Sequence, residues 1–446
     1  MNKKSILSIL VVFALLMTGC ANKNSGYITV ATPFSEELKK ELELVEESYD
    51  YTAENLQTYE RADGSTVLYL SSAPIEQSSN KIEESDDTLE ADGTYFDKTF
   101  PRSLSEETPI EITGKGSFAN IYIPDGIYDA KLKNYKNVFG TTRQGVVYED
   151  VFGKGADYIC YPTSFGVNTE IKISKKTDTN KFRIKLQLPS LTPDTNSPDY
   201  ILFKTALDNG TVESILYTPL ICDAKGKWSY ANSVRLSEKD AETNTYTVEY
   251  EVDEAFLNDK DTKFPVTLNQ SIYLYKSKQP DTSAYENTGE VAGHYLSPYM
   301  LLGDQTSKGE GWTYIRFETL EKLKIDPEKI ISAKYVFRNL FDSEKETKIA
   351  AYAVKTDWCS INTRWFNRPP HDEQPIGEVI VKNAGNYEVD ITSLLKVMLQ
   401  NKALETATYS VQNSFFIRSD TEDSNVLIAS GDNGLYTPIL EILIAG

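Results

Sequence analysis

The sequence predicts an all-β protein with two β-sandwich domains of jelly-roll type. Residues 181–188 alternate strictly between apolar and polar side chains, and residues 246–252 repeat the pattern. A period of two with one polar face is typical of antiparallel sheets. Asp-Gly and Asn-Gly pairs, such as Asn209-Gly210, supply turn signals between many short apolar runs. Short strands at this spacing indicate sandwich or jelly-roll domains.

The N-terminus predicts export and a lipid anchor. Lys3 and Lys4 precede an apolar run at 6–17, which is shorter than the roughly 20 residues that span a bilayer and has signal-peptide proportions. The run ends in LMTGC at 16–20, which resembles the lipobox of bacterial lipoproteins. That resemblance implies a signal peptide at 1–19 and acylation of Cys20, for example by palmitate. We therefore expect a chain outside the cytoplasm, anchored to the cell membrane and facing the cell wall; an ordinary secretory signal is the alternative.

Residues 20–110 are predicted to form an acidic, partly disordered tether. Between 35 and 110 the chain carries 20 acidic and 6 basic residues, so −14 of the net charge of −20 falls here. This composition is poor at forming a core. Inside the tether, Ser35–Ser48 predicts one short helix with Leu38, Leu42 and Val45 on one face, and Thr66–Leu70 predicts a strand.

Two β-domains follow, at 111–266 and 267–446, with the seam near Phe264-Pro265-Val266. Within them we expect one helix, at 390–400, because Ile391, Leu394 and Met398 lie on one helical face.

Composition and motifs argue against an enzyme. The acidic charge repels a phosphate backbone, which excludes nucleic acid as a partner. The chain has only 2 His and contains no nucleophile elbow, no phosphate-binding Gly-rich loop and no zinc helix. Cys160, Cys222 and Cys359 form no Cys-x-x-Cys pair, so we interpret them as small buried side chains; a Cys160–Cys222 disulfide stays open. A polysaccharide-degrading enzyme is the weakest alternative.

No cofactor is expected, with calcium as the alternative. Carboxylates in predicted loops could supply the hard oxygen ligands that calcium prefers. The candidates are Asp304, Asp420, Glu422, Asp423 and Asp432. The alternating acidic spacing of an EF-hand is missing, which favours a solvated surface for each of them.

Aromatic residues in the last third of the chain are the candidate ligand-binding residues. They are Trp312, Trp358, Tyr285, Tyr295 and Tyr299, with Trp365 in the same region. Flat aromatic faces stack on sugar rings, but large aromatic side chains in sandwiches also fill cores. Exposure of Trp312, Trp358 and Tyr295 decides between the two interpretations, since burial of all three favours a structural spacer.

Several motifs, taken in order, resemble one family. They are ADGS at 62–65 with DDTL at 86–89, VVYEDVF at 146–152 with ADY at 156–158, DTKFPVTL at 261–268, and, further on, MLLG at 300–303, RF at 316–317, SAKY at 332–335, TRWFNRP at 363–369, DIT at 390–392 and TPILE at 437–441. Together they resemble the extracellular N-terminal regions of bacterial wall-associated and Rhs-type surface proteins that carry a DNRLRE domain.

The resemblance implies a jelly roll for 267–446 that is related to carbohydrate-binding modules. It implies no enzyme activity and assigns no ligand residue. It also implies that Trp365, Asn367 and Pro369 belong to a structural loop. Our preferred hypothesis is a non-catalytic surface lipoprotein that binds a glycan or cell-wall component through this jelly roll. The alternative is a spacer or adhesin module that contacts protein partners and binds no sugar.

Overall fold

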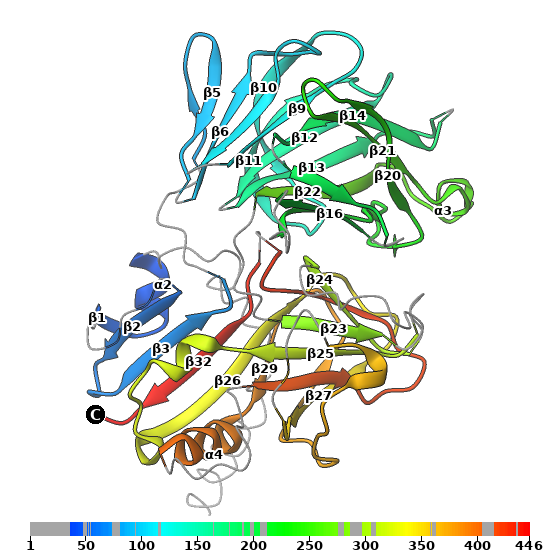
Figure 1. Ribbon diagram of the computed structural model, residues 1–446. Coiled ribbons are helices and arrows are strands. Elements are labelled where there is room, and N and C mark those ends of the chain that lie inside the picture. Colours follow the sequence, from blue (N-terminus) through cyan, green and yellow to red (C-terminus); the bar gives the residue numbers. More distant parts are fainter. Residues whose placement is uncertain are drawn as a thin grey trace, which may run out of the picture.

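The computed structural model describes residues 36–446, with gaps at 48–50, 52, 54, 74–80, 94, 115–116, 164, 178, 190, 197–199, 206–211, 275–280, 286–296, 305–308, 357, 359–362, 404–413 and 434–435. Strands make up 54% of the protein and helices 8%, which confirms the predicted all-β sandwich class. The described strands form two lobes, and each lobe contains two antiparallel sheets (Figure 1). The predicted signal peptide at 1–19 and Cys20 lie outside the described residues.

The first lobe, the upper one in Figure 1, covers residues 81–274. Its eight-stranded sheet, called sheet I, has the order β20-β21-β14-β9-β8-β6-β5-β4. The strands are β4 (Glu83–Glu84), β5 (Thr88–Ala91), β6 (Phe96–Pro101), β8 (Ile110–Gly114), β9 (Ser117–Tyr122), β14 (Lys181–Gln187), β20 (Ser233–Asp240) and β21 (Thr245–Glu251).

The second sheet of this lobe, called sheet II, is eleven-stranded, with the order β15-β16-β17-β22-β13-β12-β11-β10-β7; β18 pairs with β22 and β19 pairs with β18. The strands are β7 (Ser103–Leu104), β10 (Tyr128–Lys136), β11 (Thr142–Tyr148), β12 (Ala156–Thr163), β13 (Gly166–Ile173), β15 (Leu191–Asp194), β16 (Tyr200–Thr205), β17 (Val212–Tyr217), β18 (Leu220–Cys222), β19 (Trp228–Ser229) and β22 (Val266–Leu274). A short helix, α3 (Glu254–Asn258), precedes β22.

The second lobe combines residues from both ends of the chain. Sheet III is eight-stranded, with the order β1-β2-β3-β32-β26-β31-β24 and β29 paired to β26. Its strands are β1 (Leu44–Glu47), β2 (Leu56–Arg61), β3 (Thr66–Ser71), β24 (Tyr299–Leu302), β26 (Ile330–Asn339), β29 (Gly385–Asp390), β31 (Val426–Ala429) and β32 (Ile439–Ile444). Sheet IV is five-stranded, in the order β23 (Asp281–Tyr285), β25 (Gly311–Arg316), β30 (Ser414–Ser419), β27 (Thr347–Ala353) and β28 (Gly377–Val381).

Short helices complete this lobe. They are α2 (Glu36–Glu41), α4 (Thr392–Ala403) and the 3-10 turns η3 (Glu318–Glu321), η4 (Pro327–Lys329) and η5 (Trp365–Asn367). Helix α4 confirms the helix predicted at 390–400, and Ile391, Leu394 and Met398 are buried against the core as its apolar face requires. Among the described residues, none of the helices has the length and apolar character needed to cross a bilayer.

Apolar side chains at alternate strand positions fill the space between the sheets of each lobe. In β14, Phe182, Ile184 and Leu186 are at most 1% exposed, whereas Lys181 and Arg183 face solvent. The strict alternation of this segment therefore correctly predicts both the strand and its buried face. Cys160 and Cys222 are free and buried, which confirms their interpretation as small core side chains; Cys359 lies outside the described residues.

The described part of the predicted tether at 20–110 belongs to the two sandwiches, which corrects that prediction. Strand β3 pairs with β32, with Leu68 opposite Ile442, and Leu68 is fully buried in the second core. Leu89 and Phe100, on β5 and β6, are fully buried in the first core. A strand needs only every second residue to be apolar, so its acidic residues can face water without weakening the core. A charge count over the whole segment does not detect such alternation of buried apolar and exposed acidic residues.

The helix predicted at 35–48 is also shorter than expected. Helix α2 ends at Glu41, Glu43 adopts a left-handed φ of 59°, and the chain continues as β1. Leu44 packs beside Tyr59 and Tyr69, while Val45 is 65% exposed. Pairing with β2 therefore overrides the weak helical pattern.

The division predicted at 266/267 falls inside a strand. β22 pairs with β13 along its length, with Val266 opposite Ile173 and Tyr273 opposite Gly166. The first lobe thus extends to Leu274, and the second lobe resumes at β23.

A buried aromatic cluster joins the two lobes. The Phe139 ring, from the turn between β10 and β11, lies 5.8–5.9 Å between centroids from Tyr299, Phe341 and Tyr436 of the second lobe. Phe139 is 4% exposed. Leu220 and Cys222 of the first lobe extend the same cluster.

Hydrogen bonds cross the same interface. Tyr273 Oη donates to the Asn433 carbonyl at 2.8 Å. Tyr299 Oη donates to Asn269 Oδ1, and the hydroxyls of Thr141 and Tyr436 bond to each other. Because all of these groups except the half-buried Thr141 are buried, the interface is packed like a core, and the lobes are joined rather than loosely linked.

Candidate functional site

The outer face of sheet IV carries an unusual concentration of aromatic side chains. On β25, β27 and β30 the residues of one parity, such as Ile315, Ile349 and Ile417, fill the core of the second lobe. The other parity places Trp312, Tyr314, Tyr352 and Phe416 on the opposite face, where Trp358 joins them. We call this set the aromatic face.

Three of these rings form a nearly parallel layer. Phe416, on the central strand β30, lies 4.8 Å between centroids from Trp312 and 5.1 Å from Tyr352, with an interplanar angle of 14° in both pairs. Tyr314 lies 5.4 Å from Phe416 and extends the layer. The rigid pairing of β25 and β27 with β30 fixes these spacings.

Arginine side chains cover the layer. The Arg368 guanidinium carbon lies 4.2 Å from the centroid of Trp312 and 3.3 Å from that of Trp365. The Arg418 carbon lies 4.6 Å from the centroid of Tyr352 and 5.1 Å from that of Trp312. Cation–π attraction of this kind holds a guanidinium flat against a ring and leaves its edge available for hydrogen bonds.

A carboxylate fixes Arg418. Arg418 Nε donates to Asp420 Oδ1 at 3.0 Å, and Tyr352 Oη donates to Asp420 Oδ2 at 2.5 Å. Lys348 Nζ lies 3.6 Å from the same carboxylate. Asp420 therefore serves as an anchor for neighbouring side chains.

His371 packs edge-on against the layer, with its ring centroid 5.0 Å from Trp312 and 4.9 Å from Phe416. A backbone bridge to Val354 holds it there. Burial, the largest cause, and the Arg418 guanidinium lower the pKa of His371. The imidazole is therefore neutral at pH 7 and can both donate and accept a hydrogen bond.

The turn η5 forms the accessible part of the site. Trp365 and Arg368 are half-buried, and Phe366 is 67% exposed. The Arg364 backbone N–H donates to Asn367 Oδ1 at 2.6 Å, which closes the turn. Trp365 meets Trp312 edge-on at 5.4 Å, so the turn is packed onto the aromatic face.

The predicted aromatic residues occupy different environments. Trp312 and Trp358 are 6% and 7% exposed, so neither presents an open ring. Tyr299 is buried between the lobes. Tyr285 lies on β23, where the structure describes only the backbone, and Tyr295 lies outside the described residues.

Sequence reasoning missed Arg368, Arg418, His371 and Phe416, which surround Trp312. Phe416 and Arg418 share one face of β30, and this alternation was the available signal. The contacts of Arg368 and His371 depend on the path of the loop after β27, which alternation does not encode. For Trp365, the resemblance implied a structural loop, and the side chain does pack on Trp312 while staying partly exposed.

Two of the five calcium candidates, Asp304 and Asp420, use their carboxylates for contacts within the protein. Asp304 accepts the backbone N–H groups of Asp423 and Ser424 at 3.0 and 2.9 Å, and Asp420 binds Arg418. Asp432 is 4% exposed, and the Glu422 carbonyl accepts from Lys345. Within the described ranges, no group of three or more His, Cys, Asp or Glu side chains is placed to hold a metal ion.

Comparison with known proteins gives one family match. Among solved structures, a xanthan lyase from Paenibacillus is 9% identical, with 93% of this chain and 40% of that chain covered and a TM-score of 0.12. An exo-beta-1,3-galactanase from Phanerochaete chrysosporium is 9% identical, with 87% of this chain and 82% of that chain covered and a TM-score of 0.12. The chain thus spans 40% of the length of the xanthan lyase. Both TM-scores are too low to indicate a shared fold. No curated protein matches the chain. Residues 298–443, which contain the aromatic face, match the model of carbohydrate-binding module family 96, and this match supports carbohydrate binding by a non-catalytic module.

Proposed function

We propose that the protein is a non-catalytic surface lipoprotein that binds a cell-wall or other extracellular glycan on the outer face of sheet IV. One observation carries this proposal. Arg368, Arg418 and the half-buried Trp365 cover the aromatic face, inside the segment that matches a carbohydrate-binding module. An aromatic ring offers an apolar surface for a sugar ring, and the guanidinium edges donate to its hydroxyl or carboxylate oxygens.

Substitution at the accessible part of the site tests the proposal. The full chain is titrated with a panel of neutral and acidic polysaccharides by affinity electrophoresis, and the bound member is then followed by calorimetry. Trp365→Ala and Arg368→Ala should each weaken binding at least about tenfold, because each removes a contact worth 1.4 kcal/mol or more. The matched control is Phe118→Ala, which truncates a 42% exposed ring on the first lobe and should change nothing.

Two results would contradict the proposal. One is the failure of every polysaccharide on the panel to bind the folded wild-type chain. The other is wild-type affinity in both site variants. Product release from any bound polysaccharide would contradict the non-catalytic part.

The anchor is a separate part of the proposal. The lipobox-like sequence at 16–20 and the resemblance to DNRLRE-bearing surface proteins support attachment through Cys20. Cys20→Ala should release the protein from the membrane fraction into the medium. Retention of the variant on the membrane would refute lipidation.

We further propose that glycan binding needs no metal. The anchoring of Asp420 supports this, since its carboxylate is already paired with Arg418 and hydrogen-bonded to Tyr352. A chelator should leave the affinity unchanged. A loss of binding that calcium restores would show that the acidic loops take part.

A structural spacer is the second candidate, because Trp312 and Trp358 are buried as a spacer would require. Under this hypothesis the chain binds no member of the glycan panel. Crosslinking on intact cells would then recover surface proteins that depend on the exposed residue Phe366.

A further inference from the structure

A second concave surface lies on the outer face of sheet I, in the first lobe. It is a groove of about 420 Å³ that crosses β9, β14, β21 and β20. Half-buried side chains form its floor, among them Tyr122, Gln187, Thr245 and Thr247. Exposed charged residues, including Glu106 and Asp240, form its rim. Its volume lies within the range of ligand sites in proteins.

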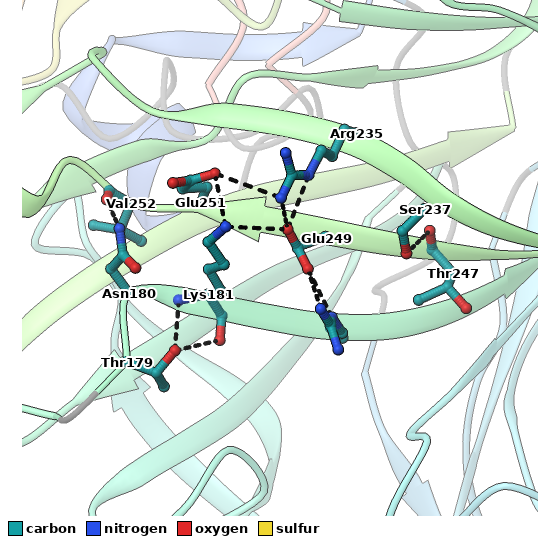
Figure 2. A network of polar contacts seen from close by, with 10 residues as sticks. Thr179, Asn180, Lys181, Arg235, Ser237, Thr247, Glu249, Glu251 and Val252 are labelled. Carbon is teal, nitrogen blue, oxygen red and sulfur yellow. Dashed lines mark hydrogen bonds and ion pairs between the residues drawn. The ribbon is translucent and has the colours of Figure 1, made fainter.

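On the neighbouring part of the same sheet face, charged side chains pair with one another. Glu249, on β21, is 1% exposed, with Arg183 Nη2 at 2.6 Å from one carboxylate oxygen and Arg235 Nε at 2.9 Å from the other. Lys181 lies between Glu249 and Glu251, at 3.8 and 3.4 Å (Figure 2). Figure 2 also shows Thr247, a floor residue of the groove, on the same strand as this network. The network satisfies the charges there. The floor of the groove begins next to it, and its charged residue, Lys185, is paired with Glu106.

The floor is held in place by hydrogen bonds. Tyr122 Oη donates to Gln187 Oε1 at 3.0 Å, and Asn120 Nδ2 donates to the same oxygen at 2.8 Å. Gln187 Nε2 donates to the Thr243 carbonyl at 3.0 Å. These bonds fix the half-buried Tyr122 ring before any ligand arrives, which lowers the entropic cost of binding.

Hydroxyl groups continue along the floor. The hydroxyls of Thr243 and Thr245 lie 2.8 Å apart. The half-buried Thr247 lines the groove next to them, and its backbone carbonyl accepts from Ser237 Oγ at 3.5 Å. Each threonine hydroxyl can donate and accept, so the floor offers a row of polar contacts beside one aromatic ring.

A bulge shapes the rim on β20. The register between β20 and β21 shifts between Leu236 and Glu238, and Glu238, Lys239 and Asp240 are exposed after it. Bulges bend an edge strand and redirect its side chains, and they are common next to binding sites. Here the redirected residues form one wall of the groove.

We propose that this groove is a second binding site of the protein and that it takes a neutral oligosaccharide. Tyr122 would stack on a sugar ring, while Gln187 and the threonine hydroxyls would bond to its hydroxyl groups. The rim charges favour a neutral ligand over an acidic one. Glu106, Glu238 and Asp240 outnumber Lys185 and Lys239, and Lys185 is already paired with Glu106. The site is independent of the aromatic face on sheet IV.

Calorimetric titration of the full chain with cellohexaose, maltohexaose, mannohexaose and chitohexaose tests the proposal. At least one hexasaccharide should bind. Tyr122→Ala should weaken it at least tenfold, while Tyr122→Phe, which keeps the ring, should lose less. Glu111→Gln changes an exposed residue of the same sheet outside the groove and is the matched control.

A variant from the other lobe separates this site from the first one. Trp365→Ala should leave hexasaccharide binding unchanged, even where it weakens polysaccharide binding. Should Tyr122→Ala fail to fold, Thr247→Val gives the same test, with a smaller loss of a few-fold. The proposal is overturned if no hexasaccharide binds, if binding survives both Tyr122→Ala and Thr247→Val, or if Trp365→Ala removes it.

Discussion

Phe139→Ala should uncouple the two lobes. The ring is 4% exposed and contacts Tyr299, Phe341 and Tyr436, all from the other lobe, at 5.8–5.9 Å. Truncation of a buried Phe to Ala costs about 3–5 kcal/mol, from lost transfer free energy and the cavity left behind. Because the lost contacts join the lobes, the cost falls on their association.

Urea unfolding followed by two probes measures this cost. Trp228 stacks on Phe341 at 6.1 Å, so tryptophan fluorescence reports on the interface once the other three tryptophans are replaced by Phe in every variant compared. Circular dichroism reports on both sandwiches. The wild-type chain should show one coincident transition. In Phe139→Ala the fluorescence transition should move to lower urea and separate from the circular dichroism transition.

The matched control is Phe118→Ala, an exposed ring on β9, which should shift the midpoint by less than about 0.5 kcal/mol. A loss of folding stability below about 1 kcal/mol in Phe139→Ala, with the two transitions still coincident, would refute the conclusion that this cluster holds the lobes together.

Three further substitutions test other parts of the structure. Burial raises the pKa of Glu170 to about 7 from 4.5, so the folded state keeps a proton that the unfolded chain loses, and stability should fall as pH rises between these values. Glu170→Gln should remove about 3 kcal/mol of that loss, measured from urea midpoints at pH 5 and pH 8; an unchanged slope would contradict the cause. Burial would raise the pKa of Glu249, but hydrogen bonds from Arg235 and Arg183 lower it, so its stabilisation holds above about pH 4.5 and is lost as pH falls. Glu249→Gln should cost about 1–3 kcal/mol of folding stability at pH 7, and the stability of this variant should fall less steeply with decreasing pH than that of the wild type. An equally steep fall in acid would contradict the role of the Glu249 carboxylate. Gly303→Ala should cost at least about 2 kcal/mol in melting experiments, because φ is 118° and the new Cβ would lie 2.1 Å from the Ser424 carbonyl oxygen; an unchanged melting temperature would refute this close approach.

Regular strands and the longer helix could be predicted because their signal is local. The alternation at 181–188 predicts β14 and its buried face, and the apolar stripe at 390–400 predicts α4. The predicted tether failed for the opposite reason. Leu68 and Leu70 are buried only because β32, far along the chain, supplies their partner strand. The residues of the acidic segment do not by themselves predict its pairing with β32.

The site shows the same limit. Position on a strand predicts which face Trp312 occupies, but not what covers that face. Arg368 and Trp365 reach it from the loop after β27 and turn an apparent open platform into a packed layer. Only the structure reveals how exposed each ring is. Trp312 is buried and Trp365 is half-buried, so Trp365 replaces Trp312 as the candidate contact for a sugar.

The joined lobes set a geometric condition on the two proposed sites. If both sites bind, a polysaccharide long enough to reach from sheet IV to sheet I gains avidity only where its own shape matches a fixed spacing. The packing around Phe139 prevents the lobes from adjusting to the ligand by a hinge. A polymer of the right spacing would then bind more tightly than its fragments, whereas one of the wrong spacing would gain nothing. Selectivity for glycan architecture would thus come from the interface between the lobes, although no residue of that interface touches a sugar.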